Sequence, residues 1–320
     1  MYRIGIDLGG TNIAVGAVNE FGRIVAKKTT PTLAKRESDD ITADMARLCL
    51  EVCADIKTPI TEIESIGIAT PGIANLDNGC VEYSCNLPYR RYPLVKKLSS
   101  MLDVDSAKIK IANDANAAAY GEAVAGAAIG SKNSIMITLG TGVGGGIIID
   151  NKIFTGHNHA AGEIGHIVIE VDGAQCGCGR KGCWEAYSSA TALIRMTKEK
   201  IEEYERAGKF TIMSEAERIS GRTACDAMRA GDPAGKEVYD KYIKYLAAGI
   251  TNMINIFQPE IISLGGGVSN EGQSLIDALT PIVDANMYCG DKARTRLKIA
   301  TLGNDAGIIG AAMLRMGLRS

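Results

Sequence analysis

The chain has 320 residues, of which 46% are hydrophobic and 22% charged, and its formal net charge is −2. This is the composition of a globular protein, and the length suggests two domains. The near-neutral charge gives no electrostatic footprint for nucleic acid, and no hydrophobic run approaches the roughly 20 residues of a membrane helix. Because Asp7 also interrupts any signal-peptide core, we expect a cytoplasmic protein without a nucleic-acid or membrane partner.

The stretch 3–18, RIGIDLGGTNIAVGAV, contains two hydrophobic runs separated by Gly9, Gly10 and Thr11. This pattern predicts a strand, a tight glycine turn and a second strand. Adjacent glycines let backbone N–H groups approach a ligand, and a concavity of such groups suits a phosphate. At the mouth of the turn, Asp7 can hold a hydrated Mg²⁺ against that phosphate. The alternative interpretation is an ordinary hairpin with a Gly-Gly turn.

The rest of the first third alternates helices and strands. The spacing of its hydrophobic residues predicts a helix over 39–55. A short buried strand over 64–69 runs into Thr70-Pro71-Gly72, a turn that stops it. A loop at 85–88, a short helix at 93–102 and a strand at 108–112 follow.

The strand at 108–112 leads into Asn113, Asp114 and an alanine-rich run. Asn or Asp before such a run predicts the N-cap of a helix, and capping alone would account for Asp114. The end of a strand at the start of a helix is also where α/β proteins place ligands. Asp114 is therefore a candidate for chemistry as well.

Residues 134–149, SIMITLGTGVGGGIII, repeat the pattern of the opening stretch, with Leu139 offset from Leu8 by 131 residues. We interpret this as an internal duplication that gives two similar domains, each with one phosphate-facing turn. Two such turns facing across a cleft could clamp a polyphosphate. The second turn contains Gly140, Thr141 and Gly142.

The second half is predicted to be mainly helical. We expect helices over 185–208, 232–257, 274–286 and 305–316, and an irregular segment over 209–221. A buried strand over 260–264 ends in Gly265, Gly266 and Gly267, and the last strand covers 297–302.

Nine cysteines are an odd number, which argues against a framework built only of disulfides. Cys176, Cys178 and Cys183 form a C-x-C-x₄-C motif with glycines that allow a tight turn. Three thiolates need a fourth ligand for a tetrahedral zinc site, which would be structural because four protein ligands leave no open position. His166 is the natural candidate, and the competing candidates are His157 and His159. The alternative is three reduced cysteines in a loop.

The other six cysteines are scattered along the chain. We expect them to be reduced packing residues: Cys49, Cys53, Cys80, Cys85, Cys225 and Cys289.

Several carboxylates and amides lie in turns that glycine, proline or cysteine marks. They are Asn86, Asn113, Asp114, Glu163 and Glu185. A sugar needs several hydrogen-bond partners in fixed directions, and zinc would fix Glu163 and Glu185 on either side of the metal loop. Each residue alone could be a solvated surface group, but their density favours a sugar site.

Phosphoryl transfer needs charge neutralisation, in-line placement and a base for the attacking hydroxyl. The glycine turns with Mg²⁺ can supply the charge neutralisation, and one aspartate can supply the base. The chain has no G-x₄-G-K-[ST] motif and no protein-kinase motif set, so these two classes of ATP-dependent protein are excluded.

Over nearly its whole length the chain resembles the ROK family of sugar kinases and repressors, within the actin-like ATPase superfamily. The resemblance rests on seven motifs: DLGGT at 7–11, TPG at 70–72, NDANAAAYGE at 113–122, LGTGVGGG at 139–146, AGEIGH at 161–166, CGCGRKGCWE at 176–185 and LGGG at 264–267. It implies an α/β protein with two actin-like, ribonuclease H-like domains that flank a cleft. The small domain would be 1–112, joined by the C-terminal helix at about 303–320, and the large domain 113–302 would carry the zinc loop.

The resemblance also implies roles for individual residues. Asp114 would be the general base toward a sugar 6-hydroxyl, and Asp7, Gly9, Gly10 and Thr11 would face the transferred phosphate and Mg²⁺. The other phosphates of ATP would contact Gly140, Thr141 and Gly142, and the adenosine would contact Gly265, Gly266 and Gly267. His166, Cys176, Cys178 and Cys183 would bind zinc. The sugar would contact Gly72, Asn86, Asn113, Asp114, Glu163, His166 and Glu185.

The expected activity is ATP-dependent phosphorylation of a hexose, with glucose as the first choice and a homo-dimer or homo-tetramer as the assembly found in the family. A kinase for N-acetylmannosamine, N-acetylglucosamine or fructose is the alternative, because nothing in the sequence recognises the C2 substituent. A non-catalytic sugar sensor and a filament-type or chaperone-type ATPase are the remaining rivals. Repressors of the family carry a DNA-binding segment before the first strand, and only six residues precede Asp7, so we expect no such domain.

Overall fold

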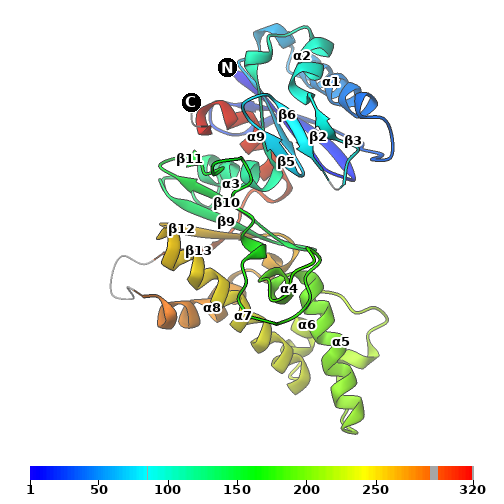
Figure 1. Ribbon diagram of the computed structural model, residues 1–320, viewed down its shortest axis with the longest axis vertical. Coiled ribbons are helices and arrows are strands. Elements are labelled where there is room, and N and C mark those ends of the chain that lie inside the picture. Colours follow the sequence, from blue (N-terminus) through cyan, green and yellow to red (C-terminus); the bar gives the residue numbers. More distant parts are fainter. Residues whose placement is uncertain (85, 289–294, 319–320) are drawn as a thin grey trace. The chain divides into compact units, whose positions relative to one another are not determined.

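A computed structural model describes residues 1–84, 86–288 and 295–318. The chain forms two compact units, each of which is discontinuous in sequence (Figure 1). Unit 1 comprises Met1–Met136, Gly146–Gly162 and Ala300–Ser320, and unit 2 comprises Ile137–Gly145 and Glu163–Ile299. Helices and strands alternate along both, which confirms the expected α/β class.

Unit 1 is built on a five-stranded sheet of order β3-β2-β1-β4-β8. Strand β1 pairs antiparallel with β2 and parallel with β4, and β4 pairs parallel with β8. Both runs of the opening stretch are thus strands, as predicted. The bounds are β1 Tyr2–Leu8, β2 Asn12–Asn19, β3 Ile24–Pro31, β4 Ile66–Thr70 and β8 Ile109–Asn113.

Alternate residues of β1 and β4 face different helices, because side chains along a strand point to opposite faces of the sheet. Ile4 and Ile6 share a buried cluster with residues of α1 (Ser38–Asp55) and α2 (Leu94–Leu102). On the other face, Gly5 and Gly67 lie against α9 (Ala306–Gly317), where a β-carbon would come within 1.9 and 1.7 Å of its backbone. These glycines let α9 approach the sheet closely.

Helix α9 also packs on α3 (Asp114–Ala125). The buried carboxylate of Glu122, near the end of α3, accepts hydrogen bonds from the N–H groups of Thr301 and Leu302 at 2.9 and 2.8 Å. The C-terminal segment is therefore an integral part of unit 1.

A second, three-stranded sheet in unit 1 was not expected from the sequence. Its order is β5-β6-β7, with bounds β5 Ile73–Asn75, β6 Cys80–Tyr83 and β7 Arg90–Tyr92. Gly72 enters this sheet with a φ of 93°, and a β-carbon there would come within 2.1 Å of the Tyr83 carbonyl oxygen. Only glycine fits this turn without strain. The loop predicted at 85–88 includes Cys85, which lies outside the described residues.

The other five-stranded sheet has the order β11-β10-β9-β12-β13, which repeats the strand order of the first sheet element by element. Its first two strands in sequence, β9 and β10, flank the second glycine turn just as β1 and β2 flank the first. This match supports the internal duplication. The bounds are β9 Ser134–Leu139, β10 Val143–Ile149, β11 Lys152–Ile153, β12 Ile261–Gly265 and β13 Arg296–Ile299.

The elements of unit 2 depart from the predictions in three places. The helix expected over 185–208 is interrupted at Ser189, whose extended backbone ends one helix and whose side chain caps the next by accepting from the N–H of Ala192. Helix α6 was also not predicted, and β13 ends three residues before the predicted end of the last strand. The helices are α4 Glu185–Ser188, α5 Ala190–Arg206, α6 Thr223–Arg229, α7 Pro233–Phe257 and α8 Gln273–Asn286.

Trp184 is fully buried against α7, with its indole N–H donating to the carbonyl of Tyr245 at 3.0 Å. A β-carbon at Gly249 of α7 would lie 1.9 Å from the indole ring. This close contact fixes the end of the cysteine motif, because Trp184 directly follows Cys183.

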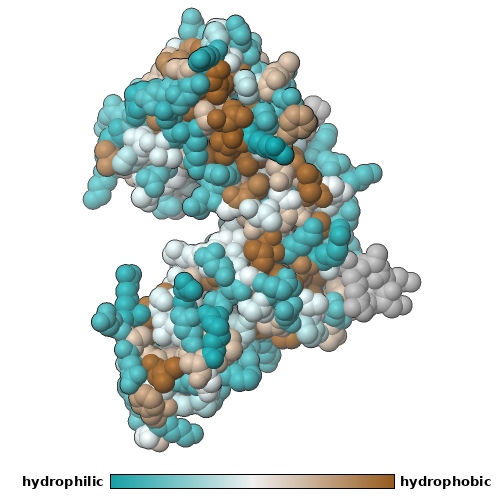
Figure 2. Space-filling model, turned by 180° about the vertical axis from the view of Figure 1, so that it is seen from behind, coloured by the Kyte–Doolittle hydropathy of each residue, from teal (hydrophilic) through white to brown (hydrophobic). Residues whose placement is uncertain are grey.

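On the face that Figure 2 shows, hydrophilic residues predominate, and hydrophobic residues gather over unit 1 in the upper part of the view. Exposed large hydrophobic residues of this unit include Val25, Leu50 and Met316. Among the described helices, none has the length and hydropathy of a membrane span. The cysteines within the described residues are all free thiols, and Cys49, Cys53 and Cys225 are buried as packing residues; Cys85 and Cys289 lie outside that part of the chain.

Candidate active site and metal centre

The first glycine turn of unit 1 is closed by a hydrogen bond from the N–H of Gly9 to the carbonyl of Asn12 at 2.9 Å. Asn86 lies beside it, since a β-carbon at Gly10 would be 3.4 Å from Cβ of Asn86. Asp7, the second-to-last residue of β1, pairs with Ala14 of β2 on one side and with Ala69 of β4 on the other. The structure thus brings the predicted phosphate turn, Asp7 and Asn86 together.

Helix α3 is capped by Asn113, which accepts hydrogen bonds from the N–H groups of Ala115 and Asn116 at 2.9 and 3.3 Å. Its side-chain amide also donates to the carbonyl of Gly72 at 3.2 Å. Because Asn113 is the cap, capping does not account for Asp114, whose exposed side chain follows as the first helical residue. The interpretation of Asp114 as the cap is therefore wrong.

Asp7 and Asp114 interact electrostatically. Burial raises the pKa of Asp7 to about 6, the negative charge of Asp114 adds to the rise, and Lys27 opposes it. Two neighbouring carboxylates, one of them half-buried, carry negative charge that a bound cation would neutralise. Hard cations such as Mg²⁺ take carboxylate oxygens as ligands. The residues present therefore fit a magnesium ion held by Asp7.

The second glycine turn lies in unit 2. The N–H of Gly140 donates to the carbonyl of Gly142 at 3.0 Å, and the carbonyl of Gly140 accepts from the N–H of Ala190 at 2.8 Å. The hydroxyl of Thr191 donates to the carbonyl of Thr141 at 2.7 Å. The start of α5 therefore holds this turn.

Glu185 connects the second turn with the cysteine motif. Its Oε2 accepts from the N–H of Val143 at 3.0 Å, and its Oε1 lies 3.6 Å from Sγ of Cys176. A β-carbon at Gly142 would come within 2.3 Å of Oε2. Glu185 thus occupies the space that the absent side chain of Gly142 leaves.

The segment that contains Glu163 packs on the same turn. Glu163 precedes a short 3₁₀ helix, Ile164–His166, and its side chain is exposed. A β-carbon at Gly165 would lie 2.1 Å from the carbonyl oxygen of Val143. Glu163, His166 and Glu185 are therefore all supported by the Gly140–Val143 turn.

His166, Cys176, Cys178 and Cys183 place one ligand atom each within 4.8 Å of one another. Sγ of Cys178 lies 3.6 Å from Sγ of Cys183, and Sγ of Cys176 lies 3.7 Å from Nδ1 of His166. Thiolates at tetrahedral angles about 2.3 Å from zinc are about 3.8 Å apart. The donor set and its spacing therefore fit zinc. Of the three candidate histidines, the cluster contains His166, whereas His159 pairs with Asp77 at 3.1 Å.

Arg180 supports the cluster from within the motif. Its guanidinium donates to the carbonyl of His166 at 2.9 Å. Hydrogen bonds from the backbone and side chain of Arg180 lower the pKa of Cys178 to about 6, whereas burial raises the pKa of Cys176 and of Cys183. Arg180 therefore favours the thiolate of Cys178, and the thiolate is the form that binds a metal.

The predicted adenosine segment, Gly265–Gly267, joins β12 to a 3₁₀ helix in unit 2. Gly266 has a φ of 84°, and a β-carbon there would be 2.6 Å from the carbonyl oxygen of Leu139. The end of β12 therefore lies against the end of β9, next to the second glycine turn.

The predicted site residues divide between the two units. The residues Asp7, Gly9, Gly10, Thr11, Gly72, Asn86, Asn113 and Asp114 belong to unit 1, and Gly140, Thr141, Gly142, Glu163, His166, Glu185, Gly265, Gly266, Gly267 and the three zinc-motif cysteines belong to unit 2. The hydroxyl of Thr32 donates to the carbonyl of Gly9 at 2.6 Å, and a β-carbon at Gly307 would lie 2.7 Å from Oδ2 of Asp7. The sequence analysis missed these two residues and also the supporting residues Lys27 and Arg180. Of these, only Arg180 had a visible indication, its place inside the C-x-C-x₄-C motif.

Comparison with known proteins places the chain in a family. The model of the ROK family matches residues 3–317. A glucokinase of Thermotoga maritima is 35% identical over 312 residues, covering 97% of this chain and 96% of that protein. An N-acetylgalactosamine kinase of Shewanella sp. is 30% identical over 328 residues, covering 98% of this chain and 96% of that protein.

Among solved structures, a ROK family glucokinase from Streptomyces griseus, in complex with glucose and AMPPNP, is similar with a TM-score of 0.77. It is 33% identical, and the match covers 99% of this chain and 100% of that one. The chain belongs to the ROK family. It has the mixed α/β, actin-like and ribonuclease H-like ATPase fold of the ROK sugar kinases.

Proposed function

We propose that the protein is an ATP-dependent hexokinase that transfers the γ-phosphoryl group of ATP to the 6-hydroxyl of glucose. The observation that carries the proposal is the place of Asp7 at the end of β1, directly before the Gly9–Thr11 turn, within electrostatic range of Asp114 at the start of α3. The full-length similarity to the Thermotoga and Streptomyces glucokinases supports the reaction and the substrate.

In this proposal Asp114 accepts the proton of the sugar hydroxyl as that oxygen attacks phosphorus. Its exposed position at the first residue of α3 leaves the carboxylate accessible to a substrate. Asp7 orients the metal, and the backbone N–H groups of the Gly9–Thr11 turn orient the transferred phosphoryl group. Mg²⁺, when bound, neutralises phosphate charge.

The sugar would be held by hydrogen bonds from Asn86, Asn113, Glu163, His166 and Glu185, with Gly72 shaping its loop. His166 can serve both zinc and sugar, because Nδ1 is the atom that faces Cys176 and Nε2 remains for a hydroxyl. Zinc would be structural, holding Glu163 and Glu185 at a fixed separation. Gly140–Gly142 and Gly265–Gly267 would contact the remaining phosphates and the adenosine of ATP.

A kinase for an N-acetylated hexose is the second candidate. The similarity to the Shewanella N-acetylgalactosamine kinase favours it. The same carboxylates and amides could bind either class of sugar, so the residue that faces the C2 substituent decides between them.

A coupled assay of ADP release, run with ATP across a panel of hexoses, tests the proposal. We expect glucose to give the highest kcat/KM, and Asp114→Asn protein to serve as the blank. Highest turnover with an N-acetylhexosamine would select the second candidate. Sugar binding without ADP release would indicate a sensor, and ATP turnover independent of any sugar would indicate a filament-type or chaperone-type ATPase.

We further propose a domain division at residue 112, with 113–302 as the large domain and the helix at about 303–320 joined to the small domain. A homo-oligomer and a cytoplasmic location complete the proposal. Exposed hydrophobic residues on unit 1 support the oligomer, and reduced thiols at a zinc motif suit the cytoplasm. Light scattering coupled to size exclusion measures the assembly directly.

A further inference from the structure

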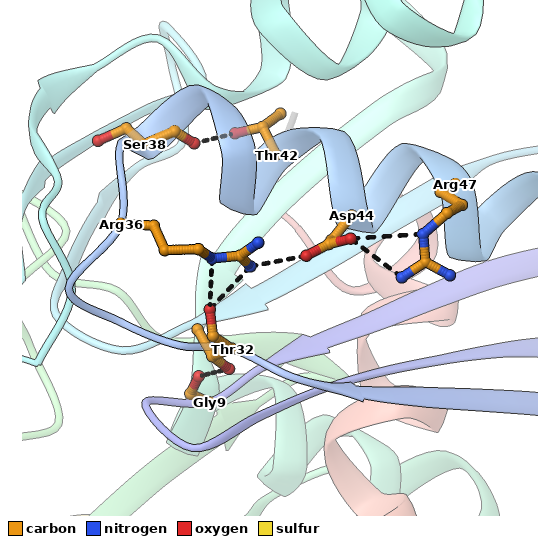
Figure 3. A network of polar contacts seen from close by, with 7 residues as sticks. All are labelled: Gly9, Thr32, Arg36, Ser38, Thr42, Asp44 and Arg47. Carbon is orange, nitrogen blue, oxygen red and sulfur yellow. Dashed lines mark hydrogen bonds and ion pairs between the residues drawn. The ribbon is translucent and has the colours of Figure 1, made fainter.

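Thr32, the residue that follows strand β3, binds both ends of the first glycine turn. Its hydroxyl donates to the carbonyl of Gly9 at 2.6 Å, and its N–H donates to the carbonyl of Thr11 at 2.8 Å. The side chain of Thr32 is fully buried. Figure 3 shows its hydroxyl directed at Gly9. One residue outside the turn therefore fixes two of its peptide groups.

These two contacts determine where the amides of the turn point. In a trans peptide group the N–H points opposite to the C=O. With the carbonyls of Gly9 and Thr11 directed at Thr32, the N–H groups of Gly10 and Asn12 are turned away from it. Glycine at positions 9 and 10 would otherwise give the turn many accessible conformations.

Thr32 is itself held by an ionic network formed by Arg36, which precedes helix α1, and by Asp44 and Arg47 on that helix. Nε and a terminal nitrogen of Arg36 donate to the carbonyl of Thr32 at 3.2 and 2.8 Å, and Arg36 also pairs with Asp44 at 2.6 Å. Asp44 in turn pairs with Arg47 at 3.0 Å. Figure 3 shows Arg36 between Thr32 and Asp44. A charged residue that donates twice to a backbone carbonyl restricts that carbonyl strongly.

Unit 2 contains an equivalent arrangement at the duplicated turn. There the carbonyls of Gly140 and Thr141 accept from the N–H of Ala190 and the hydroxyl of Thr191. Both glycine turns therefore have two carbonyls held from outside, one of them by a threonine hydroxyl. The two threonines come from different elements, the end of a strand and the start of a helix, so the shared feature is the function of the contact.

We propose that Thr32 is a positioning residue for phosphoryl transfer: it presets the first glycine turn so that the N–H groups of Gly10 and Asn12, which point away from Thr32, face the phosphoryl group of ATP, with Arg36 fixing Thr32. This inference rests on the proposed kinase function. Without the contact, only a fraction of molecules holds the turn in its competent form, and the apparent affinity for the nucleotide falls by that fraction.

The test compares three variants. Thr32→Val keeps the shape of the side chain and removes the hydroxyl, whereas Thr32→Ser retains it. Thr42→Val is the matched control, because Thr42 is also fully buried in unit 1 and its hydroxyl contacts Ser38 and Tyr92, away from the turn. A hydrogen bond of this kind corresponds to about a threefold to tenfold change in an equilibrium constant.

For Thr32→Val we expect the dissociation constant of AMPPNP with Mg²⁺, measured by calorimetry, to rise about threefold to tenfold. We expect kcat/KM for ATP to fall by at least the same factor while KM for glucose stays within about twofold. Thr32→Ser restores both values. Thr42→Val leaves the dissociation constant of AMPPNP and kcat/KM for ATP unchanged, although its thermal unfolding temperature falls as far as that of Thr32→Val. Equal nucleotide parameters in Thr32→Val and Thr42→Val would overturn the proposal.

Arg36→Gln gives a second route if Thr32→Val does not fold. Its control is Arg47→Gln, which also breaks a contact with Asp44 but none with Thr32. We expect weaker nucleotide binding in Arg36→Gln than in Arg47→Gln, and identical values would contradict the inference. If the wild-type protein phosphorylates no sugar, the proposed function fails; amide hydrogen exchange over residues 9–12 still measures whether Thr32 holds the turn.

Discussion

The carboxylate of Asp7 lies against Gly307 of helix α9, so closely that a β-carbon at residue 307 would come within 2.7 Å of Oδ2. The atoms in the way are the far end of a side chain, which can move. We therefore expect Gly307→Ala to displace the Asp7 carboxylate and to lower kcat by tenfold or more. Alanine is favoured over glycine in a helix by about 1 kcal/mol. This gain offsets the cost of moving the Asp7 side chain, so the free energy of unfolding should change little.

Gly310→Ala is the comparison for this prediction. It adds the same methyl group to the same helix, but there the β-carbon would lie 1.7 Å from the backbone oxygen of Ala117. Backbone cannot yield as a side chain does, so Gly310→Ala should lower the unfolding temperature clearly. Urea unfolding and steady-state kinetics of both variants separate the two effects. Unchanged kcat in Gly307→Ala would show that the position of Asp7 does not matter.

The pKa of Asp7 predicts how stability depends on pH. The folded value of about 6 lies above the roughly 3.9 of an unfolded aspartate. The folded protein therefore binds more protons between these values, and the stabilisation from protonated Asp7, complete below about pH 4, is lost as the pH rises through 6.

Asp7→Asn should thus stabilise the ligand-free protein by about 2–3 kcal/mol at pH 7, with a smaller gain at pH 5. Urea unfolding of both proteins at pH 5, 6, 7 and 8 measures this difference. A gain that does not change with pH would contradict the assignment. Activity should be lost in the variant, and Mg²⁺ should raise the unfolding temperature of the wild type more than that of Asp7→Asn.

Asp114→Asn should lower kcat by about 10²–10⁴-fold if Asp114 is the base. Because Asn113 supplies the helix cap, the variant should keep its fold and its sugar affinity, which calorimetry with glucose measures. A decrease in kcat of less than tenfold would remove Asp114 from this role. Asn113→Ala, as the contrast, should cost about 1 kcal/mol of stability through the lost cap.

Cys178→Ser should release zinc and weaken glucose binding, because Glu185 contacts Cys176 of the same cluster and supports the Gly140–Val143 turn. Metal analysis of the purified wild type should give one zinc per chain. Cys225→Ser serves as the control, since Cys225 is a buried thiol outside the cluster. Wild-type protein free of zinc would refute the structural role of the metal.

Long helices in which hydrophobic residues recur at helical spacing were predictable from the sequence. Helix α1, expected over 39–55, covers Ser38–Asp55, and α7, expected over 232–257, covers Pro233–Phe257. The missed strands are short or lie at an edge: β5 and β7 have three residues each, and β3 carries lysines and threonines instead of a buried core pattern. The break at Ser189 depends on a single side-chain cap. A serine inside a helical pattern does not by itself indicate that the helix ends there.

The residues of the candidate site were predictable where glycines, cysteines or carboxylates formed motifs. Their supports were not, because these come from elements far apart in sequence. Gly307 lies 300 residues beyond Asp7, and Thr32 touches Gly9 only because β2 and β3 pair in one register. Such contacts are set by packing, and local sequence patterns carry no information on them.

Because helix α9 is at the end of the chain, unit 1 can be completed only at the end of synthesis. The sheet of unit 1 is formed by the strands that leave the ribosome first. Its face around Gly5 and Gly67 is covered by residues 306–317, which are synthesised last. All of unit 2 is translated before that helix. The nascent N-terminal sheet must therefore stay partly uncovered while nearly the whole chain is made, and chaperone binding at that stage should involve this face.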